Sequence, residues 1–132
     1  MSKKLLFPKG FLQQGEIYLV DFNRKQEKEI FKIRPALVAS SDLQNEYDKQ
    51  ILVALISAEV ELTEEEIKLL SVLSIIVSPT KETGLKRESR ILLHRVRAVS
   101  KGKPRILEYL GAVNPKVLKQ VKETLKIVFD WE

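Results

Sequence analysis

The chain has 132 residues and a net charge of +5 at pH 7, with 44% hydrophobic and 31% charged residues, a balance typical of one soluble globular domain. One histidine and no cysteine exclude disulfides, thiolate metal sites, a cysteine nucleophile and a histidine-pair nuclease. The apolar run at residues 5–7 is too short for a signal peptide, and no run approaches the roughly 18 residues that span a bilayer, so we expect a cytoplasmic protein without membrane contact.

The first half of the chain alternates apolar runs with polar turns. Residues 15–22 follow a glycine turn and predict a strand, and the wholly polar residues 23–29 predict an exposed loop. Residues 30–40 predict a second strand, and residues 41–49, which are rich in Asp and Asn, predict a turn. The almost continuously apolar residues 50–57 predict a central strand that ends at Ser57. Connections this short favour antiparallel pairing.

Arg34 and Pro35 stand directly ahead of the apolar residues 36–39 in the second of these strands. Pro35 cannot donate to a ladder, so it marks an edge strand or the start of a strand. A permanently charged guanidinium at this position has two explanations. It is either a fixed cation that faces a bound anion, or one half of a strand-end ion pair with Glu16 or Asp21.

An acidic insert follows at about residues 58–72. Five glutamates lie within residues 59–66, and Thr63 is suited to cap a short helix over residues 62–70 whose first turn is acidic. The cluster lacks a loop that would fold carboxylates around an ion, so we expect neither a metal nor a cofactor.

The remaining elements complete a mainly β fold. Residues 71–78 predict a strand, residues 80–86 a loop and residues 87–100 a long strand. The segment at about residues 114–130 predicts an amphipathic helix, because Asn114 suits the N-cap, a proline follows at the first helical position and apolar side chains recur at helical spacing. The whole chain, residues 1–132, is therefore expected to form a single domain, a small twisted antiparallel barrel with a C-terminal helix.

Basic residues gather in the second half of the chain. Residues 81–105 hold nine Lys and Arg against two Glu, which indicates a polyanionic partner or, alternatively, a solvated basic face. Strict alternation along the strand at 87–100 would place one set of side chains together, Ser89, Ile91, Leu93, Arg95 and Arg97, and a second set on the other face, Arg90, Leu92, His94, Val96 and Ala98.

The available chemistry consists of arginines, hydroxyl groups and a basic surface. RNA cleavage fits this set because RNA carries its own nucleophile, the 2′-hydroxyl beside the scissile phosphate. The protein needs only to align it, stabilise the charge that develops on phosphorus and allow two protons to move. A preorganised arginine supplies the stabilisation, and its planar fork suits phosphate better than an ammonium group does.

The order of the motifs resembles the MazF/PemK family of toxin endoribonucleases. The resemblance runs from about residue 14 to residue 129 and depends on "GEIYLVDF", "IRPALVASSDLQNEY", "ILVALIS" and "GLKRESRILLHRVRAV" followed by a helix. It implies the barrel of the CcdB/PemK type and a homodimer. It also implies metal-independent, sequence-selective cleavage of single-stranded RNA to 2′,3′-cyclic phosphate and 5′-hydroxyl ends, with inhibition by a cognate antitoxin.

The resemblance also implies site residues. Arg34, before the proline, would be the central catalytic residue and Ser57 its partner, where the family usually has threonine. The resemblance would place Ser89, His94 and Arg95 near the RNA, with Arg95 standing where a glutamine is frequent. Phe31 lies where the family often has a glycine and is expected to stack on a base, and Lys32 and Arg97 are further expected RNA contacts. Two alternatives remain: a non-catalytic barrel that binds RNA or an antitoxin, and a gyrase-binding protein of the CcdB type.

Overall fold

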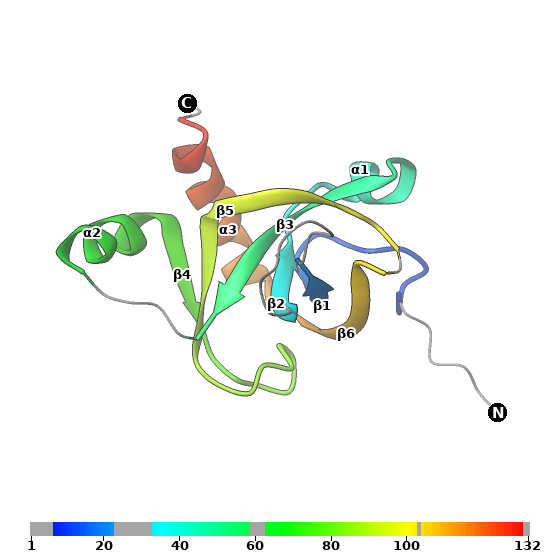
Figure 1. Ribbon diagram of the computed structural model, residues 1–132, viewed down its shortest axis with the longest axis horizontal. Helices are drawn as coiled ribbons and strands as arrows, with labels where there is room; N and C mark the ends of the chain where they lie inside the picture. The colour runs from blue at the N-terminus through cyan, green and yellow to red at the C-terminus, as the bar shows by residue number, and fades with distance from the viewer. Residues whose placement is uncertain (1–6, 23–32, 59–62, 103, 131–132) are drawn as a thin grey trace, which may run out of the picture.

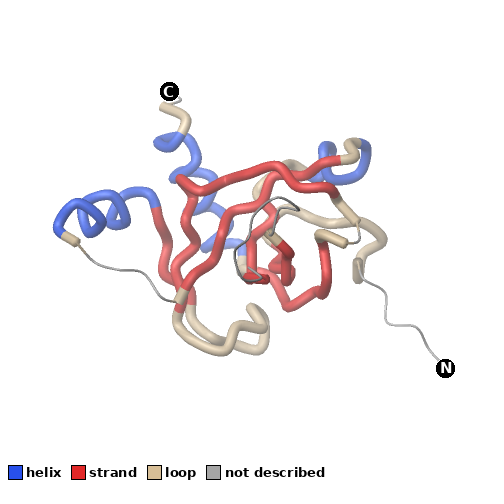
Figure 2. The backbone as a smooth tube through the Cα atoms, in the orientation of Figure 1, coloured by secondary structure: helices blue, strands red, loops and turns tan. Residues whose placement is uncertain are grey.

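The computed structural model describes residues 7–22, 33–58, 63–102 and 104–130. The loop predicted at 23–29, the first part of the strand predicted at 30–40, and the predicted RNA-binding residues Phe31 and Lys32 lie outside the described residues. The described residues form six strands and three helices, with the helices at the periphery of the strands (Figures 1 and 2).

The strands form one antiparallel sheet in the order β4-β5-β3-β2-β1-β6. Their bounds are β1 Glu16–Asp21, β2 Ile33–Val38, β3 Gln50–Ser57, β4 Ser74–Val77, β5 Ser89–Ser100 and β6 Ile106–Ala112. The predicted mainly β, antiparallel class is confirmed, but the sheet is open, with β4 and β6 at its two ends. Strand β4 does not pair with β6, but the loop after β4 contacts β6: the Ala112 amide donates a hydrogen bond to the Glu82 carbonyl at 2.7 Å.

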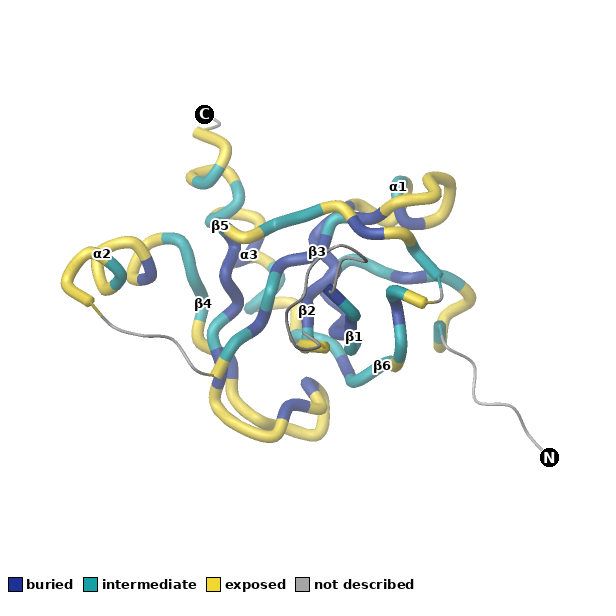
Figure 3. Tube along the Cα trace, in the orientation of Figure 1, coloured by how far each residue is buried: buried dark blue, intermediate teal, exposed yellow. Residues whose placement is uncertain are grey.

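Alternation along the strands gives the sheet an apolar cluster on each face. One cluster contains Tyr18, Val20, Ala36, Val38, Ile51 and Val53. The other contains Ile17, Leu37, Ala54, Ile56, Ile91 and Leu93, and it is covered by helix α3, Pro115–Val128, through the fully buried Val121. Figure 3 shows the buried positions concentrated in the strands, whereas helix α2, Glu64–Leu73, and the outer side of α3 are exposed.

Helix α3 spans Pro115–Val128 and confirms the predicted C-terminal helix. The Asn114 side chain accepts a hydrogen bond from the Val117 amide at 2.8 Å, as an N-cap should, and the proline stands in the first turn.

The acidic insert forms a longer helix than predicted. Helix α2 spans Glu64–Leu73, and the Thr63 hydroxyl accepts from the Glu66 amide as expected. The predicted strand at 71–78 is wrong for its first three residues, which continue α2 as far as Leu73. The helix stops there because the Ser74 amide and hydroxyl both donate to the Leu70 carbonyl.

Two further segments differ from the prediction. The turn predicted at 41–49 contains a six-residue helix, α1, Asp42–Tyr47, whose first turn is capped by the Ser41 hydroxyl. The segment that forms β6 carried no prediction of its own, although it pairs with β1 along its length.

Strand β5 carries a bulge that overturns the predicted alternation. Ala54 of β3 pairs with Val96, but the next residue, Leu55, pairs with Leu92, so residues 93–95 have no register partner on β3. Val96 consequently packs in the same apolar cluster as Leu93. Arg97 is turned to the opposite face, where its guanidinium lies over the Phe22 ring.

Candidate functional site

The pairing of β2 with β3 brings Arg34 and Ser57 toward one another. The register sets Ala36 opposite Leu55 and Val38 opposite Val53. The observed pairing stops at Ala36 and Leu55, and alternation beyond it directs the side chains of Arg34 and Ser57 to the same face of the sheet. The two predicted catalytic residues therefore lie on one face at the end of the β2–β3 pair.

A cavity of about 410 Å³ opens at this position and is called the arginine cavity below. It is lined by Phe22, Arg34, Leu55, Ser57, Arg95, Val96 and Arg97. Four residues predicted from the sequence are thus brought together: Arg34, Ser57, Arg95 and Arg97. Three arginines and one serine in the lining of a single cavity make a composition suited to a phosphate group.

Arg97 is oriented by an aromatic neighbour. Its guanidinium carbon lies 5.4 Å from the centroid of the Phe22 ring, within the range of a cation–π contact. Phe22 is only 7% exposed, so the ring provides a fixed wall against which the guanidinium rests. Phe22 was not predicted as a site residue; the signal available was its place at the end of the first predicted strand.

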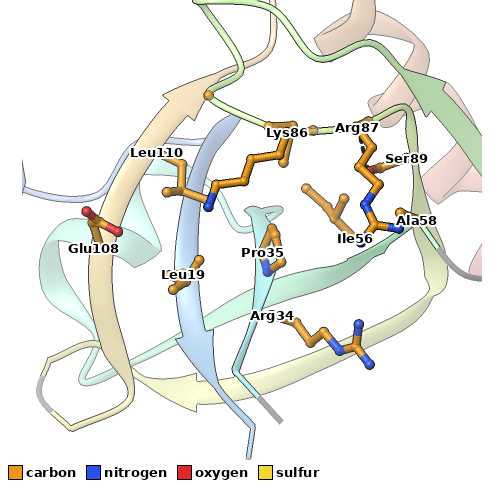
Figure 4. A pocket seen from close by; sticks show the side chains of 12 residues that line it. Leu19, Arg34, Pro35, Ile56, Ala58, Lys86, Arg87, Ser89, Glu108 and Leu110 are labelled. Atoms are coloured by element: carbon orange, nitrogen blue, oxygen red, sulfur yellow. Dashed lines mark hydrogen bonds between the residues drawn. The ribbon is translucent and has the colours of Figure 1, made fainter.

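A second cavity of about 320 Å³ lies beside the loop that joins β4 to β5 and is called the loop cavity. Its lining residues are Leu19, Arg34, Pro35, Ile56, Ala58, Gly84, Leu85, Lys86, Arg87, Ser89, Glu108 and Leu110. Figure 4 shows Lys86 extending across the cavity toward Leu110 and Leu19, and Arg87 extending toward Ala58. Ser89, predicted to lie near RNA, lines this cavity and not the arginine cavity.

His94 lies outside both cavities. It lines neither cavity and lies against α2, with Glu66 and the Leu73 backbone among its neighbours. Burial lowers the pKa of His94 below its ordinary value, and the positive charge of Arg95 lowers it further. Both effects favour the neutral imidazole, and its buried Nδ1 has no hydrogen-bond partner among the described residues.

The alternative pairing of Arg34 with Glu16 is not formed. Glu16 is 2% exposed at the start of β1, whereas Arg34 pairs with Val20 near the other end of that strand. One carboxylate oxygen of Glu16 accepts from the Gln13 amide at 2.7 Å and from the Tyr18 hydroxyl at 3.1 Å. This carboxylate raises the pKa of Tyr18 in addition to the effect of burial. The Glu16 carboxylate thus binds groups of the fold at the start of β1 and does not pair with Arg34.

The "NEY" segment also has a structural role. Asn45 is fully buried and its side-chain amide donates to the Ser40 carbonyl at 3.0 Å, while the Ser40 hydroxyl donates to the Asn45 side-chain oxygen. Lys101 donates to the Asn45 and Glu46 carbonyls at the end of α1, both at 2.8 Å. These contacts hold α1 against the strands.

No three His, Cys, Asp or Glu side chains within the described ranges come together as a metal site. Of the helices in those ranges, none is long and apolar enough to cross a membrane.

Comparison with known proteins gives related sequences and a related fold. A profile of the family described as PemK-like, MazF-like toxin of type II toxin-antitoxin system matches residues 13–129. Endoribonuclease EndoA of Bacillus subtilis (strain 168) is 27% identical over 116 residues, which are 88% of this chain and 92% of the relative. Endoribonuclease MazF of Staphylococcus saprophyticus is 28% identical over 116 residues, 88% of this chain and 89% of the relative. A solved endoribonuclease in complex with its cognate antitoxin, from a mycobacterial species, has the same fold at a TM-score of 0.68 and 12% identity, covering 92% of this chain and 97% of that one.

Proposed function

This chain belongs to the PemK-like, MazF-like family of toxins of type II toxin-antitoxin systems, and on that premise we propose that it is an endoribonuclease that cleaves single-stranded RNA. The family resemblance inferred from the motifs is confirmed. Two curated relatives that align over 88% of the chain are themselves named endoribonucleases. The observation that carries the proposal is the arginine cavity, in which Arg34 and Ser57 line one space with Arg95 and Arg97.

The reaction we propose is transesterification within the RNA. The 2′-oxygen attacks the adjacent phosphorus, a new 2′-O–P bond forms, and the P–O5′ bond breaks. The products are a 2′,3′-cyclic phosphate and a 5′-hydroxyl end. The 2′-hydroxyl loses a proton to water and the departing 5′-oxygen gains one from water, so atoms and charge balance.

Arg34 has the central role in this proposal. Its guanidinium would donate two parallel hydrogen bonds to the non-bridging oxygens, where negative charge grows as the fifth bond to phosphorus forms. The Ser57 hydroxyl, across the cavity mouth, would hold the same phosphate in the orientation that attack requires. Arg95 and Arg97 would bind the flanking phosphate or a base edge. His94 lines neither cavity, so its predicted contact with RNA requires a part of the strand outside them.

The test is an Arg34→Ala variant assayed on a long mixed-sequence RNA in the presence of chelator. We expect a loss of about 10²–10³ in cleavage rate, the usual effect of removing one preorganised donor. Lys122→Ala, an exposed change on α3, is the control for the loss of one positive charge. Mapping of the cut ends should give 5′-hydroxyls. Wild-type cleavage by the Arg34 variant would refute the assignment of the site.

The partners follow from the same proposal. The solved mycobacterial endoribonuclease is bound to its cognate antitoxin, which supports a cognate antitoxin as the inhibitor of this chain. We propose further that the active form is a homodimer and that it acts in the cytoplasm, where its RNA substrate is found. A gyrase-binding protein of the CcdB type would not need Arg34 and Ser57 in one cavity, and it would keep its effect in the Arg34→Ala variant.

A further inference from the structure

We propose that the loop cavity is a second nucleotide subsite, in which an apolar floor takes a base and Lys86 with Arg87 takes a phosphate of the same RNA strand. The inference rests on the proposed function, because it places a neighbouring nucleotide next to the one whose phosphate Arg34 holds. It assigns to Lys86 and Arg87 a role that neither the motifs nor the comparisons supply.

The first argument is the position of Arg34. Among the described lining residues, Arg34 is the one that the two cavities share. Pro35 and Ile56 line the loop cavity, whereas their neighbours Arg34, Leu55 and Ser57 line the arginine cavity, so the two spaces lie on opposite faces of the β2–β3 pair. A single strand that passes over the end of β2 would therefore enter both cavities and cross Arg34 between them.

The second argument is the chemistry of the lining. Leu19, Pro35, Ile56 and Leu110 present apolar surface, which suits the face of a base. Lys86 and Arg87 are both exposed and reach over this floor from one loop (Figure 4). The acidic lining residue, Glu108, lies on β6 away from Arg87 in the same view. Cations above an apolar floor match a nucleotide, which has an anionic phosphate and a flat apolar base.

The third argument is that the loop is held in place before any ligand binds. Gly84 has a φ of +68°, and a Cβ there would lie 2.0 Å from the Leu110 carbonyl oxygen. A Cβ on Gly111 would lie 2.1 Å from the Glu82 carbonyl oxygen. The loop backbone is therefore packed directly on β6. The Ser89 hydroxyl also donates to the Arg87 carbonyl at 2.9 Å, which fixes the backbone next to the basic pair. A loop whose backbone is already fixed loses less conformational entropy on binding.

The experiment measures binding separately from cleavage. An RNA oligomer that contains the cleavage sequence, with a 2′-deoxy nucleotide at the scissile position, cannot react and is titrated by fluorescence anisotropy. The variant is Lys86→Ala/Arg87→Ala, and the matched control is Lys119→Ala/Lys122→Ala, which removes two exposed charges from α3. Melting temperatures establish that both variants are folded.

We expect the loop variant to raise Kd about tenfold relative to the control and to lower the salt dependence of binding by about 0.7 in slope, which corresponds to one phosphate contact on a single strand. The difference should vanish with an oligomer shortened by the nucleotides on one side of the scissile position. Equal Kd values for the loop variant and the control would overturn the subsite and leave the cavity available to an acidic protein segment instead.

The outcomes separate the subsite from the reaction. If the wild type binds the deoxy oligomer through Lys86 and Arg87 but does not cleave RNA, the proposed reaction fails and the subsite stands. If the wild type cleaves RNA and the loop variant binds like its control, the subsite fails and the reaction stands. A wild type that does not bind the oligomer at all overturns both.

Discussion

Gly111→Ala is the substitution whose effect the structure determines most directly. The added Cβ would lie 2.1 Å from the Glu82 carbonyl oxygen, 2.6 Å from the Thr83 carbonyl carbon and 2.7 Å from the Thr83 carbonyl oxygen. All three atoms are backbone, so no side-chain rotamer relieves the overlap. The loop must withdraw from β6 by about 1 Å before ordinary contact is restored.

The cost has two parts. Overpacking of this kind costs about 1–3 kcal/mol. Withdrawal of the loop also breaks the hydrogen bond from the Ala112 amide to the Glu82 carbonyl, worth about 1 kcal/mol. We therefore expect the free energy of unfolding to fall by about 2–4 kcal/mol. The same movement would displace Lys86 and Arg87 and weaken RNA binding.

The appropriate assay is urea denaturation of the Gly111→Ala variant, compared with that of a Gly102→Ala control. A Cβ on Gly102 meets nothing within 4 Å, so this control carries the general effect of replacing glycine without the clash. The two midpoints should differ clearly, with similar m-values. A Gly111→Ala protein within about 0.5 kcal/mol of its control would refute the claim that the loop is packed directly on β6.

Three further predictions concern single side chains. Ser57→Ala should lower the cleavage rate about tenfold to hundredfold, which is the effect of losing one hydrogen bond to a charged group. Ser57→Thr should retain or exceed wild-type activity, because the threonine methyl group restricts the hydroxyl rotamer. Equal cleavage rates for the wild type and both variants would remove Ser57 from the site. Because the pKa of His94 is lowered in the folded state, its contribution to the free energy of unfolding is complete above pH 6.5 and decreases as the pH falls toward the folded-state pKa. The urea midpoint should therefore drop less between pH 7.5 and 5.5 in His94→Gln than in the wild type. Parallel pH profiles of the two proteins would contradict this. Asn114→Ala should cost about 1 kcal/mol by removing the cap that accepts from the Val117 amide, and an unchanged thermal midpoint would show that α3 is held by packing alone.

The parts of the fold that were predictable depend on local signals. The strand at Gln50–Ser57 follows from an uninterrupted apolar run, and α3 follows from its cap, its first-turn proline and its apolar spacing. Arg34 and Ser57 were predicted on the strength of a family resemblance, and the structure brings them to one cavity. Whether they catalyse cleavage remains a prediction.

The features that were missed depend on partners distant in sequence. Nothing within residues 87–100 signals that three residues of β5 will stand out of register, because the bulge exists only relative to β3. Strand β6 mixes exposed, half-buried and buried positions and is defined by its pairing with β1. The loop cavity requires Gly84 to pack on Leu110, and Gly111 to pack on Glu82 and Thr83, across more than twenty residues, and no local pattern predicts these contacts.

Pro35 explains why a cavity forms where the arginine stands. The Ala39 amide donates to the Leu52 carbonyl of β3 at 2.8 Å, and in an antiparallel ladder alternate residues of a strand donate to the same neighbour. The next donors along β2 toward its start are therefore Leu37 and residue 35. A proline at 35 has no amide hydrogen, so the bond to the Ile56 carbonyl cannot form, and the observed β2–β3 pairing begins at Ala36. Beyond that point β2 and β3 are free to part, with Arg34 on one side of the opening and Ser57 on the other. The proline thus does more than restrict the backbone beside the arginine: it ends the β2–β3 ladder next to Arg34, where the proposed RNA phosphate would need room to bind.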